Sequence, residues 1–246
     1  MNKTLTKKSY LKKINKLKKY NQAYYEKDSP IISDQQYDIL KKKIIDLENE
    51  YKYLKNNESP SQSVGFKPSK NFQKIKHKVP MLSLDNAFNE EDLKNFEKKI
   101  IKFLSLEDAS TIEYSAEPKI DGISASLIYS KGKFTKGLSR GDGLEGEDIT
   151  QNLKTIKDIP DQIIEKNFPE EIDIRGEVFI ENNDFKKIND KFANPRNAAS
   201  GSLRQKNSTK TSKIPLKFIA YTHGYENKMK IDNQIDFLKN LKLWGF

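Results

Sequence analysis

The sequence predicts an α+β fold, in which a helical N-terminal unit precedes a domain of helices and antiparallel strands. Two hydrophobic periods indicate this arrangement. Apolar residues recur every three to four positions over residues 4–50, which is typical of amphipathic helices. After residue 110 the period becomes two, which is typical of half-buried strands, and helical segments lie between these strands.

The N-terminal unit is expected to be a helical hairpin over residues 1–57. Its first helix covers residues 4–26, and Ser33 followed by Gln36 forms a capping-box pattern that opens the second. Residues 58–80 are polar and rich in turn formers, which predicts a linker, and the second domain then covers residues 81–246. The stripe of the first helix is expected at Leu5, Leu11, Ile14, Leu17, Asn21 and Tyr24.

The second domain opens with a helix capped by Asn89. Residues 123–140 alternate around the turn Lys131-Gly132, which predicts a β-hairpin. Further strands are expected over residues 172–180 and 216–222. Two more helices are expected over residues 181–192 and 232–243.

Composition excludes several classes of site. The chain of 246 residues has no cysteine and two histidines, so disulfides, thiol catalysis and cysteine or histidine-rich metal centres are excluded within it. No segment is apolar enough to span a membrane or serve as a secretory signal, which favours a soluble cytoplasmic protein without membrane partners.

A net charge of +10 leaves two explanations open. Lysine and arginine neutralise phosphates, which favours a nucleic-acid partner. Alternatively, lysine-rich codon usage places lysines on solvated faces, since only four of the 45 basic residues are arginines. These four arginines lie within motifs, where a planar group can meet phosphate or carboxylate. They are Arg140, Arg175, Arg196 and Arg204.

Residues 141–146 (GDGLEG) match the glycine pattern of dinucleotide-binding loops. Such loops point backbone amides at a pyrophosphate, which the carboxylates of Asp142 and Glu145 would repel. The surrounding strands are also expected to be antiparallel. A turn is therefore predicted here.

Residues 119–122 (KIDG) combine a lysine, an aspartate two residues on and a glycine at a strand end. Alone, this pattern could be chance in a lysine-rich chain. It is followed in order by SRGDG (139–143), RGE (175–177) and NPRNAASGSLRQ (194–205), and preceded by VPMLSLDN (79–86) and the segment 24–38. Together these motifs resemble the NAD⁺-dependent DNA ligases of bacteria, over essentially the whole chain.

The resemblance implies a nucleotidyltransferase domain that reacts a lysine with NAD⁺. Lys119 would attack the adenylyl phosphorus and become adenylated, and Asp121 would orient it. Arg140 would bind a phosphate or ribose, while Glu177 would bind ribose hydroxyls or support the metal environment. Glu117 would recognise adenine and Tyr221 would stack against it. The remaining residues of this pocket would be Ser83 and Leu84.

The helical unit would bind the nicotinamide mononucleotide half of NAD⁺. Its expected binding residues are Tyr24, Tyr25, Asp34, Gln35, Gln36, Tyr37 and Asp38. Tyr37 also has a structural alternative, because it lies on an apolar helix stripe. ATP-dependent ligases share the KxDG motif but lack this unit, so ATP use is the less favoured reading.

The resemblance further implies nicked double-stranded DNA as a partner, with Arg196 and Arg204 on the DNA-facing surface. Mg²⁺ or Mn²⁺ would assist, without a dedicated protein metal site, and a monomer is expected. The sequence stops before later family motifs that carry lysines, and zinc is expected only in a cysteine module beyond them. Two hypotheses follow: a ligase fragment that adenylates itself, or a catalytically incomplete module that binds NAD⁺ or nicked DNA.

Overall fold

A computed structural model describes residues 3–25, 31–56, 59, 72–107, 112–188, 192–229 and 231–246. Two compact units form the chain. One comprises Met1–Met81 together with Ile120–Phe246, and the other comprises Leu82–Lys119. Most of the predicted linker lies outside the described residues.

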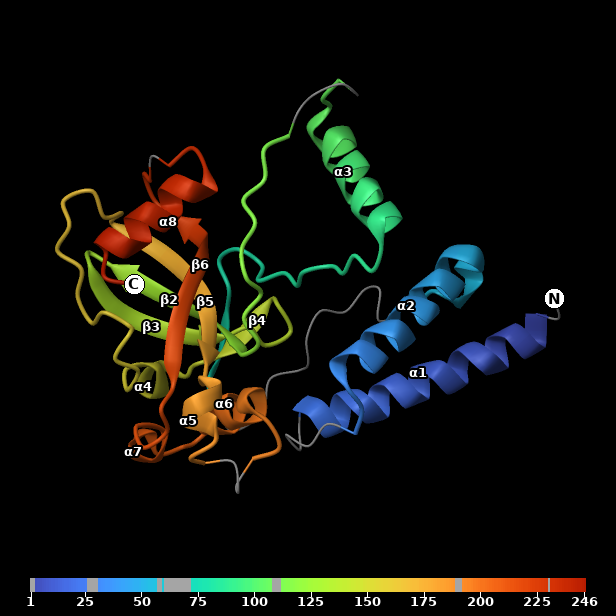
Figure 1. Cartoon of the computed structure of the whole chain (residues 1–246), viewed down its shortest axis with the longest axis horizontal. Helices are drawn as coiled ribbons and strands as arrows, with labels where there is room; N and C mark the ends of the chain where they lie inside the picture. The colour runs from blue at the N-terminus through green and yellow to red at the C-terminus, as the bar shows by residue number, and fades with distance from the viewer. Residues whose placement is uncertain are drawn as a thin grey trace. The chain divides into compact units, whose positions relative to one another are not determined.

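The helical hairpin consists of α1 (Lys3–Tyr25) and α2 (Asp34–Glu50), followed by the short η1 (Lys52–Leu54) (Figure 1). The predicted capping box is confirmed, since Ser33 and Gln36 exchange both side-chain to backbone hydrogen bonds. The predicted stripe is partly wrong, because Leu5 and Leu11 are exposed. The helix is rotated so that Thr6 and Tyr10, which carry hydroxyls, share the buried stripe with Ile14 and Leu17.

Tyr10 is buried because its hydroxyl has a partner inside the hairpin. It donates to the buried carboxylate of Glu48 on α2 at 2.8 Å, and Ser59 also hydrogen-bonds this carboxylate. A buried hydroxyl with a partner costs little, so tyrosine can occupy a core position. The spacing of apolar residues in the sequence could not reveal the hydrogen bond between Tyr10 and Glu48.

The second domain is built on an antiparallel sheet with the strand order β3-β2-β5-β6. The predicted α+β class is thereby confirmed. The turn between β2 and β3 uses Gly132 at a φ of +75°, a region that favours glycine. The strands are β2 (Ile123–Ser130), β3 (Lys133–Ser139), β5 (Glu171–Phe179) and β6 (Lys217–Glu226).

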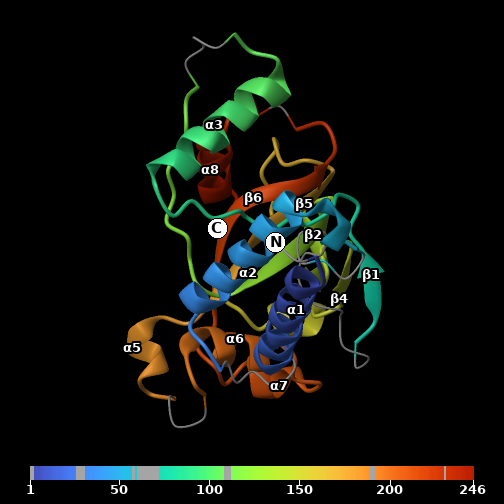
Figure 2. The ribbon, with the colours of Figure 1, turned by 90° about the vertical axis from the view of Figure 1, so that its right-hand side faces the viewer.

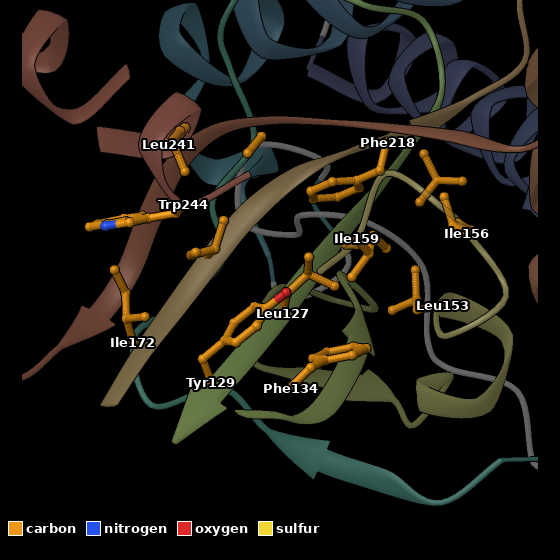
Figure 3. Packing of buried hydrophobic residues seen from close by; sticks show 14 of the residues in the cluster. Leu127, Tyr129, Phe134, Leu153, Ile156, Ile159, Ile172, Phe218, Leu241 and Trp244 are labelled. Carbon is orange, nitrogen blue, oxygen red and sulfur yellow. The ribbon is translucent and has the colours of Figure 1, made fainter. Parts of the chain in front are cut away.

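One face of this sheet forms the main hydrophobic core. Leu127 and Tyr129 from β2, Ile172 from β5 and Phe218 from β6 converge there (Figure 3). Leu153 comes from a short helix, Leu241 comes from the C-terminal helix, and Trp244 directly follows that helix. These helices are α4 (Thr150–Leu153) and α8 (Gln234–Leu243).

The opposite face of the sheet is polar, although much of it is buried. Because side chains alternate along a strand, Asp173, Arg175 and Glu177 of β5 share this face. Each is 5–7% exposed. Ser124 and Ser126 of β2 lie opposite Glu177 and Arg175 in the ladder. We call this surface the polar face of the sheet.

Two sequence predictions of local structure are corrected. Residues 74–76, expected in the linker, form β1 (Lys74–Lys76), which pairs antiparallel with β4 (Glu145–Glu147) (Figure 2). The helix expected over 181–192 is only α5 (Asn182–Phe185) within the described residues. The chain turns after it before α6 (Pro195–Leu203) and α7 (Ser208–Thr211).

The Leu82–Lys119 unit contains α3 (Glu90–Leu104), which the side chain of Asn89 caps as predicted. Its apolar residues recur at helical spacing, yet none of its residues is buried. Phe96 contacts Tyr114 within the same unit, with ring centroids 6.5 Å apart.

Candidate active site

Gly122 joins the KIDG segment to the polar face. The glycine directly precedes β2 and lies tightly against β5, because a Cβ there would approach Val178 O to 2.3 Å and Glu177 Cγ to 2.9 Å. Real Cβ atoms do not approach this closely, so glycine permits the contact. The structure therefore brings Asp121-Gly122 and Glu177 together, from segments that are far apart in sequence.

Glu177 is fixed by a residue that sequence reasoning missed. Ser124 lies directly across the ladder, and its Oγ donates to Glu177 Oε2 at 2.9 Å. Both residues lie on the polar face, which the period-two alternation of 123–129 indicates. What the sequence alone does not give is the register that places serine opposite glutamate.

Tyr221 joins this group from β6. The ladder has an irregularity here, since Arg175 pairs with Thr222 while Gly176 pairs with Ala220, so Tyr221 is the extra residue. Such bulges re-aim side chains. Burial raises the pKa of Tyr221, and the negative charge of Glu177 raises it further. A hydrogen bond with Ser124 and the charges of Arg140 and Arg175 oppose this rise.

Arg140 directly follows β3, beside the GDG turn, and is half-buried. Its carbonyl accepts a hydrogen bond from His77 Nε2 at 3.1 Å. In the turn, Asp142 Oδ1 accepts the backbone amides of Leu144 and Glu145 at 3.0 and 2.9 Å. The amides that a pyrophosphate would need therefore already donate to a carboxylate, which confirms the predicted turn.

Arg175 is a buried anchor on the polar face. Its guanidinium pairs with Asp173 at 2.9 Å and donates to the carbonyls of Val79 at 2.6 Å and Pro80 at 3.0 Å. The next residue, Met81, donates its amide to Gly143 O at 2.8 Å. Arg175 therefore fixes the segment that leads into residues 82–119.

Arg196 and Arg204 both come from the segment of α6, and each meets a carboxylate. Arg196 Nη1 donates to Asp121 Oδ1 at 2.8 Å. Arg204 Nε lies 3.8 Å from Glu147 Oε2, a carboxylate that is 3% exposed. Two predicted site residues, Asp121 and Arg196, are therefore in direct contact.

Four predicted site residues belong to the Leu82–Lys119 unit, and each is exposed there. Glu117 accepts a hydrogen bond from Ser115 Oγ at 3.2 Å. Ser83 Oγ approaches the carbonyl of Leu84 at 3.4 Å. Lys119 ends this unit, two residues before Asp121.

Five of the predicted residues of the helical unit, 34–38, form the first turns of α2. Tyr37 is half-buried and packs on the hairpin core, as its structural alternative predicted. Asp38 is half-buried beside it, and Gln35 is exposed. The Gln36 side chain accepts the Ser33 amide in the capping box. The side chains of Tyr24, Tyr25 and Asp34 lie outside the described part of the structure.

Two negative findings concern the described residues alone. No three histidine or acidic side chains among them converge as metal ligands. None of their helices has the length and apolar character needed to cross a bilayer.

Comparison with known proteins decides the family. Residues 69–246 match the model of the NAD-dependent DNA ligase adenylation domain. The chain belongs to this family. Residues 4–65 match a second model, the DNA ligase-like, N-terminal NAD⁺-binding domain. The resemblance found in the sequence motifs is therefore confirmed across both parts of the chain.

Proteins named DNA ligase from three bacteria are among the relatives of this chain. The Pelagibacter ubique protein is 78% identical over 237 residues, which cover 96% of this chain and 35% of the relative. The Parvibaculum lavamentivorans protein is 46% identical, covering 94% and 34%. The Rickettsia bellii protein is 44% identical, covering 100% and 36%. The chain thus spans about a third of the length of these relatives.

Proposed function

We propose that this chain is the NAD⁺-binding and self-adenylating part of an NAD⁺-dependent DNA ligase. In the proposed step, Lys119 Nζ attacks the adenylyl phosphorus of NAD⁺. A P–N bond forms, the P–O bond to nicotinamide mononucleotide breaks, and that mononucleotide leaves. The observation that carries the proposal is the tight contact of Gly122, three residues after the lysine, with Glu177.

The polar face supplies groups suited to a nucleotide. Glu177, held by Ser124, would accept ribose hydroxyls, and Tyr221 would stack on adenine. Arg140 would bind a phosphate or ribose through its planar donors. Asp121 would orient Lys119, whose amine must lose a proton before it can attack. In the same proposal, Glu117 would recognise adenine, and Ser83 and Leu84 would line the nucleotide pocket.

The helical unit would select NAD⁺ over ATP by binding the nicotinamide mononucleotide half. Aromatic faces suit nicotinamide, and carboxylates suit ribose hydroxyls. The half-buried positions of Tyr37 and Asp38 on α2 support this role. We assign the same role to Tyr24, Tyr25, Asp34, Gln35 and Gln36.

The later steps involve nicked double-stranded DNA. AMP would pass from Lys119 to the 5′-phosphate at the nick, and the 3′-hydroxyl would then displace AMP. Arg196 and Arg204 would bind phosphates near the lysine, positioning the nick without reading its sequence.

The residues of this site fit a divalent ion that arrives with the substrate. The described residues offer no three-ligand cluster, and Mg²⁺ commonly needs one or two carboxylates plus phosphates and water. Glu177 is the buried carboxylate that would face such an ion, Mg²⁺ or Mn²⁺. When bound, the ion supplies positive charge that offsets the charge on the phosphates.

Three further features belong to the same proposal. We propose a cytoplasmic protein that acts as a monomer. We also propose functional boundaries of 1–57 for the mononucleotide-binding unit, 58–80 for a linker that ends with β1 and the residues after it, and 81–246 for the adenylation domain.

Labelling tests the proposed chemistry. The chain is incubated with adenine-labelled NAD⁺ and Mg²⁺, denatured, and mapped by mass spectrometry. We expect AMP on Lys119, no label in Lys119→Arg, and full label in Lys133→Arg, which alters another exposed lysine. Equal labelling of Lys119→Arg and the wild type would refute the assignment.

The same experiment separates the alternatives. Labelling from ATP but not NAD⁺ would establish an ATP-using enzyme. Absence of label, together with calorimetric binding of NAD⁺ or nicked DNA, would establish a catalytically incomplete binding module. That second function is considered because the chain spans about a third of its relatives.

A further inference from the structure

Helix α1 has an unusual charge composition. Its 23 residues contain eight lysines and no acidic residue, whereas the whole chain has 35 acidic residues in 246. A general preference for lysine explains many lysines, but it does not explain the absence of acids. Helix α2, in the same hairpin, carries both signs of charge.

Four of these lysines form one exposed row. Lys8, Lys12, Lys16 and Lys19 follow at helical spacing and fall within about 80° of the helix circumference. This row lies opposite the buried stripe, which includes Tyr10 and Ile14 and packs on α2. We call these four residues the lysine face.

The lysine face does not stabilise its own helix. Like charges four residues apart repel, and lysines near the helix N-terminus oppose the helix dipole. In the described structure no ion pair involves these four lysines; Lys16 lies over the Tyr20 ring at 5.7 Å. By contrast, α3 places three acids in its first turn and pairs Lys94 with Glu90 at 2.7 Å.

We propose that the lysine face binds the phosphate backbone of duplex DNA without regard to sequence. The proposal rests on the proposed function only in taking DNA as the partner. Steps of four residues advance about 6 Å along the helix, close to the through-space separation of neighbouring phosphates on one strand. Compact ammonium groups on flexible stems suit such contacts, which need charge rather than fixed geometry.

The test compares two variants with equal loss of charge. One replaces Lys8, Lys12, Lys16 and Lys19 with Gln, and the control replaces Lys94, Lys98, Lys99 and Lys102 of α3 with Gln. Binding to a short intact duplex is measured by fluorescence anisotropy over a range of NaCl concentrations. Circular dichroism checks that each variant is folded.

We expect the lysine-face variant to lose about tenfold or more in affinity at low salt. The slope of log K against log salt should also fall in magnitude by up to about 3.6, since each lost phosphate contact contributes about 0.9. The α3 variant should remain near the wild type. A third variant, with arginine at the same four α1 positions, should keep both the affinity and the slope.

Three results would overturn the proposal. The first is an equal loss of duplex affinity in the α1 and α3 variants. The second is a wild type that has no affinity for the duplex. The third is a lysine-face variant that no longer binds phosphatidylglycerol vesicles but keeps its affinity for the duplex. Labelling at Lys119 is measured in parallel and should be unchanged in the lysine-face variant. If the wild type is labelled at Lys119 but does not bind duplex DNA, the proposed DNA-binding surface is refuted and the proposed adenylation is not. If the wild type binds duplex DNA through α1 but Lys119 is not labelled, the proposed adenylation is refuted and the proposed DNA-binding surface is not.

Discussion

Asp121 and Arg196 are 75 residues apart in sequence, yet their side chains meet at 2.8 Å. The arginine is mostly shielded and the carboxylate is largely exposed, at 20% and 67% side-chain accessibility. The contact therefore joins the aspartate of the KIDG motif to the helix that we propose faces DNA.

A double-mutant cycle on this pair should separate stability from function. Because water screens the exposed carboxylate, we expect a coupling of about 0.5 kcal/mol between Asp121→Asn and Arg196→Gln in urea unfolding. In the labelling reaction, each single change should reduce the rate of Lys119 adenylation by a much larger factor than a free-energy change of about 0.5 kcal/mol would produce. Rates that track the loss of stability would instead make the pair purely structural.

Gly122→Ala should disrupt the junction between the KIDG segment and β5. The new Cβ would overlap Val178 O, a backbone atom that cannot move without distorting the sheet. We expect a loss of about 1–3 kcal/mol of unfolding free energy and a strong loss of Lys119 labelling. Gly201→Ala, within α6, is the control and should be neutral or slightly stabilising. A fully active Gly122→Ala protein would contradict the close approach.

Ser124→Ala and Ser126→Ala form a matched pair on β2. Each removes a hydroxyl that donates to a carboxylate on β5, Glu177 in the first case and Asp173 in the second. Both should lose about 1–3 kcal/mol of stability. We expect only Ser124→Ala to change the labelling kinetics, through a raised KM for NAD⁺, because Glu177 would bind ribose. Ser124→Thr should restore much of the activity, and equal kinetic effects in both alanine variants would exclude a positioning role for Ser124.

His77 should make stability depend on pH on the acid side of neutrality. Burial lowers its pKa below the usual 6.5, and the Arg175 charge adds to this, while the carbonyl of Arg140 and nearby acids oppose it. The unfolded chain therefore takes up the proton first, so stability falls as pH drops below about 6.5. Thermal melts from pH 7.5 to 5 should show a smaller decline in His77→Gln than in the wild type. His223→Gln controls for loss of a histidine elsewhere, and an unchanged decline in His77→Gln would refute the prediction.

Features with short-range causes could be predicted from the sequence. The Ser33–Gln36 capping box, the Asn89 cap and the Lys131-Gly132 turn each depend on a few neighbouring residues, and all three are confirmed. The antiparallel sheet followed from the period of two. The α+β class could therefore be derived before the structure was known.

Features with long-range causes could not be predicted. The Ser124–Glu177 contact depends on the register between strands 53 positions apart, and the bulge at Tyr221 depends on the whole ladder. Arg175 lies in a recognisable motif, but its carbonyl partners at Val79 and Pro80 lie more than 90 positions away. The α1 stripe was misjudged because the hydroxyl of Tyr10 has a partner, Glu48, on another helix.

Trp244, the chain's one tryptophan, is 4% exposed and stacks edge-on against Phe168, with ring centroids 4.9 Å apart. It lies at the end of α8 against the apolar face of the sheet (Figure 3). Its fluorescence therefore reports melting of the sheet domain, whereas the hairpin of α1 and α2 contains only tyrosine as a fluorophore. One unlabelled sample thus carries a tryptophan signal from the sheet domain and a tyrosine signal to which both parts contribute, and a tyrosine transition without a matching tryptophan transition would reveal separate melting of the hairpin.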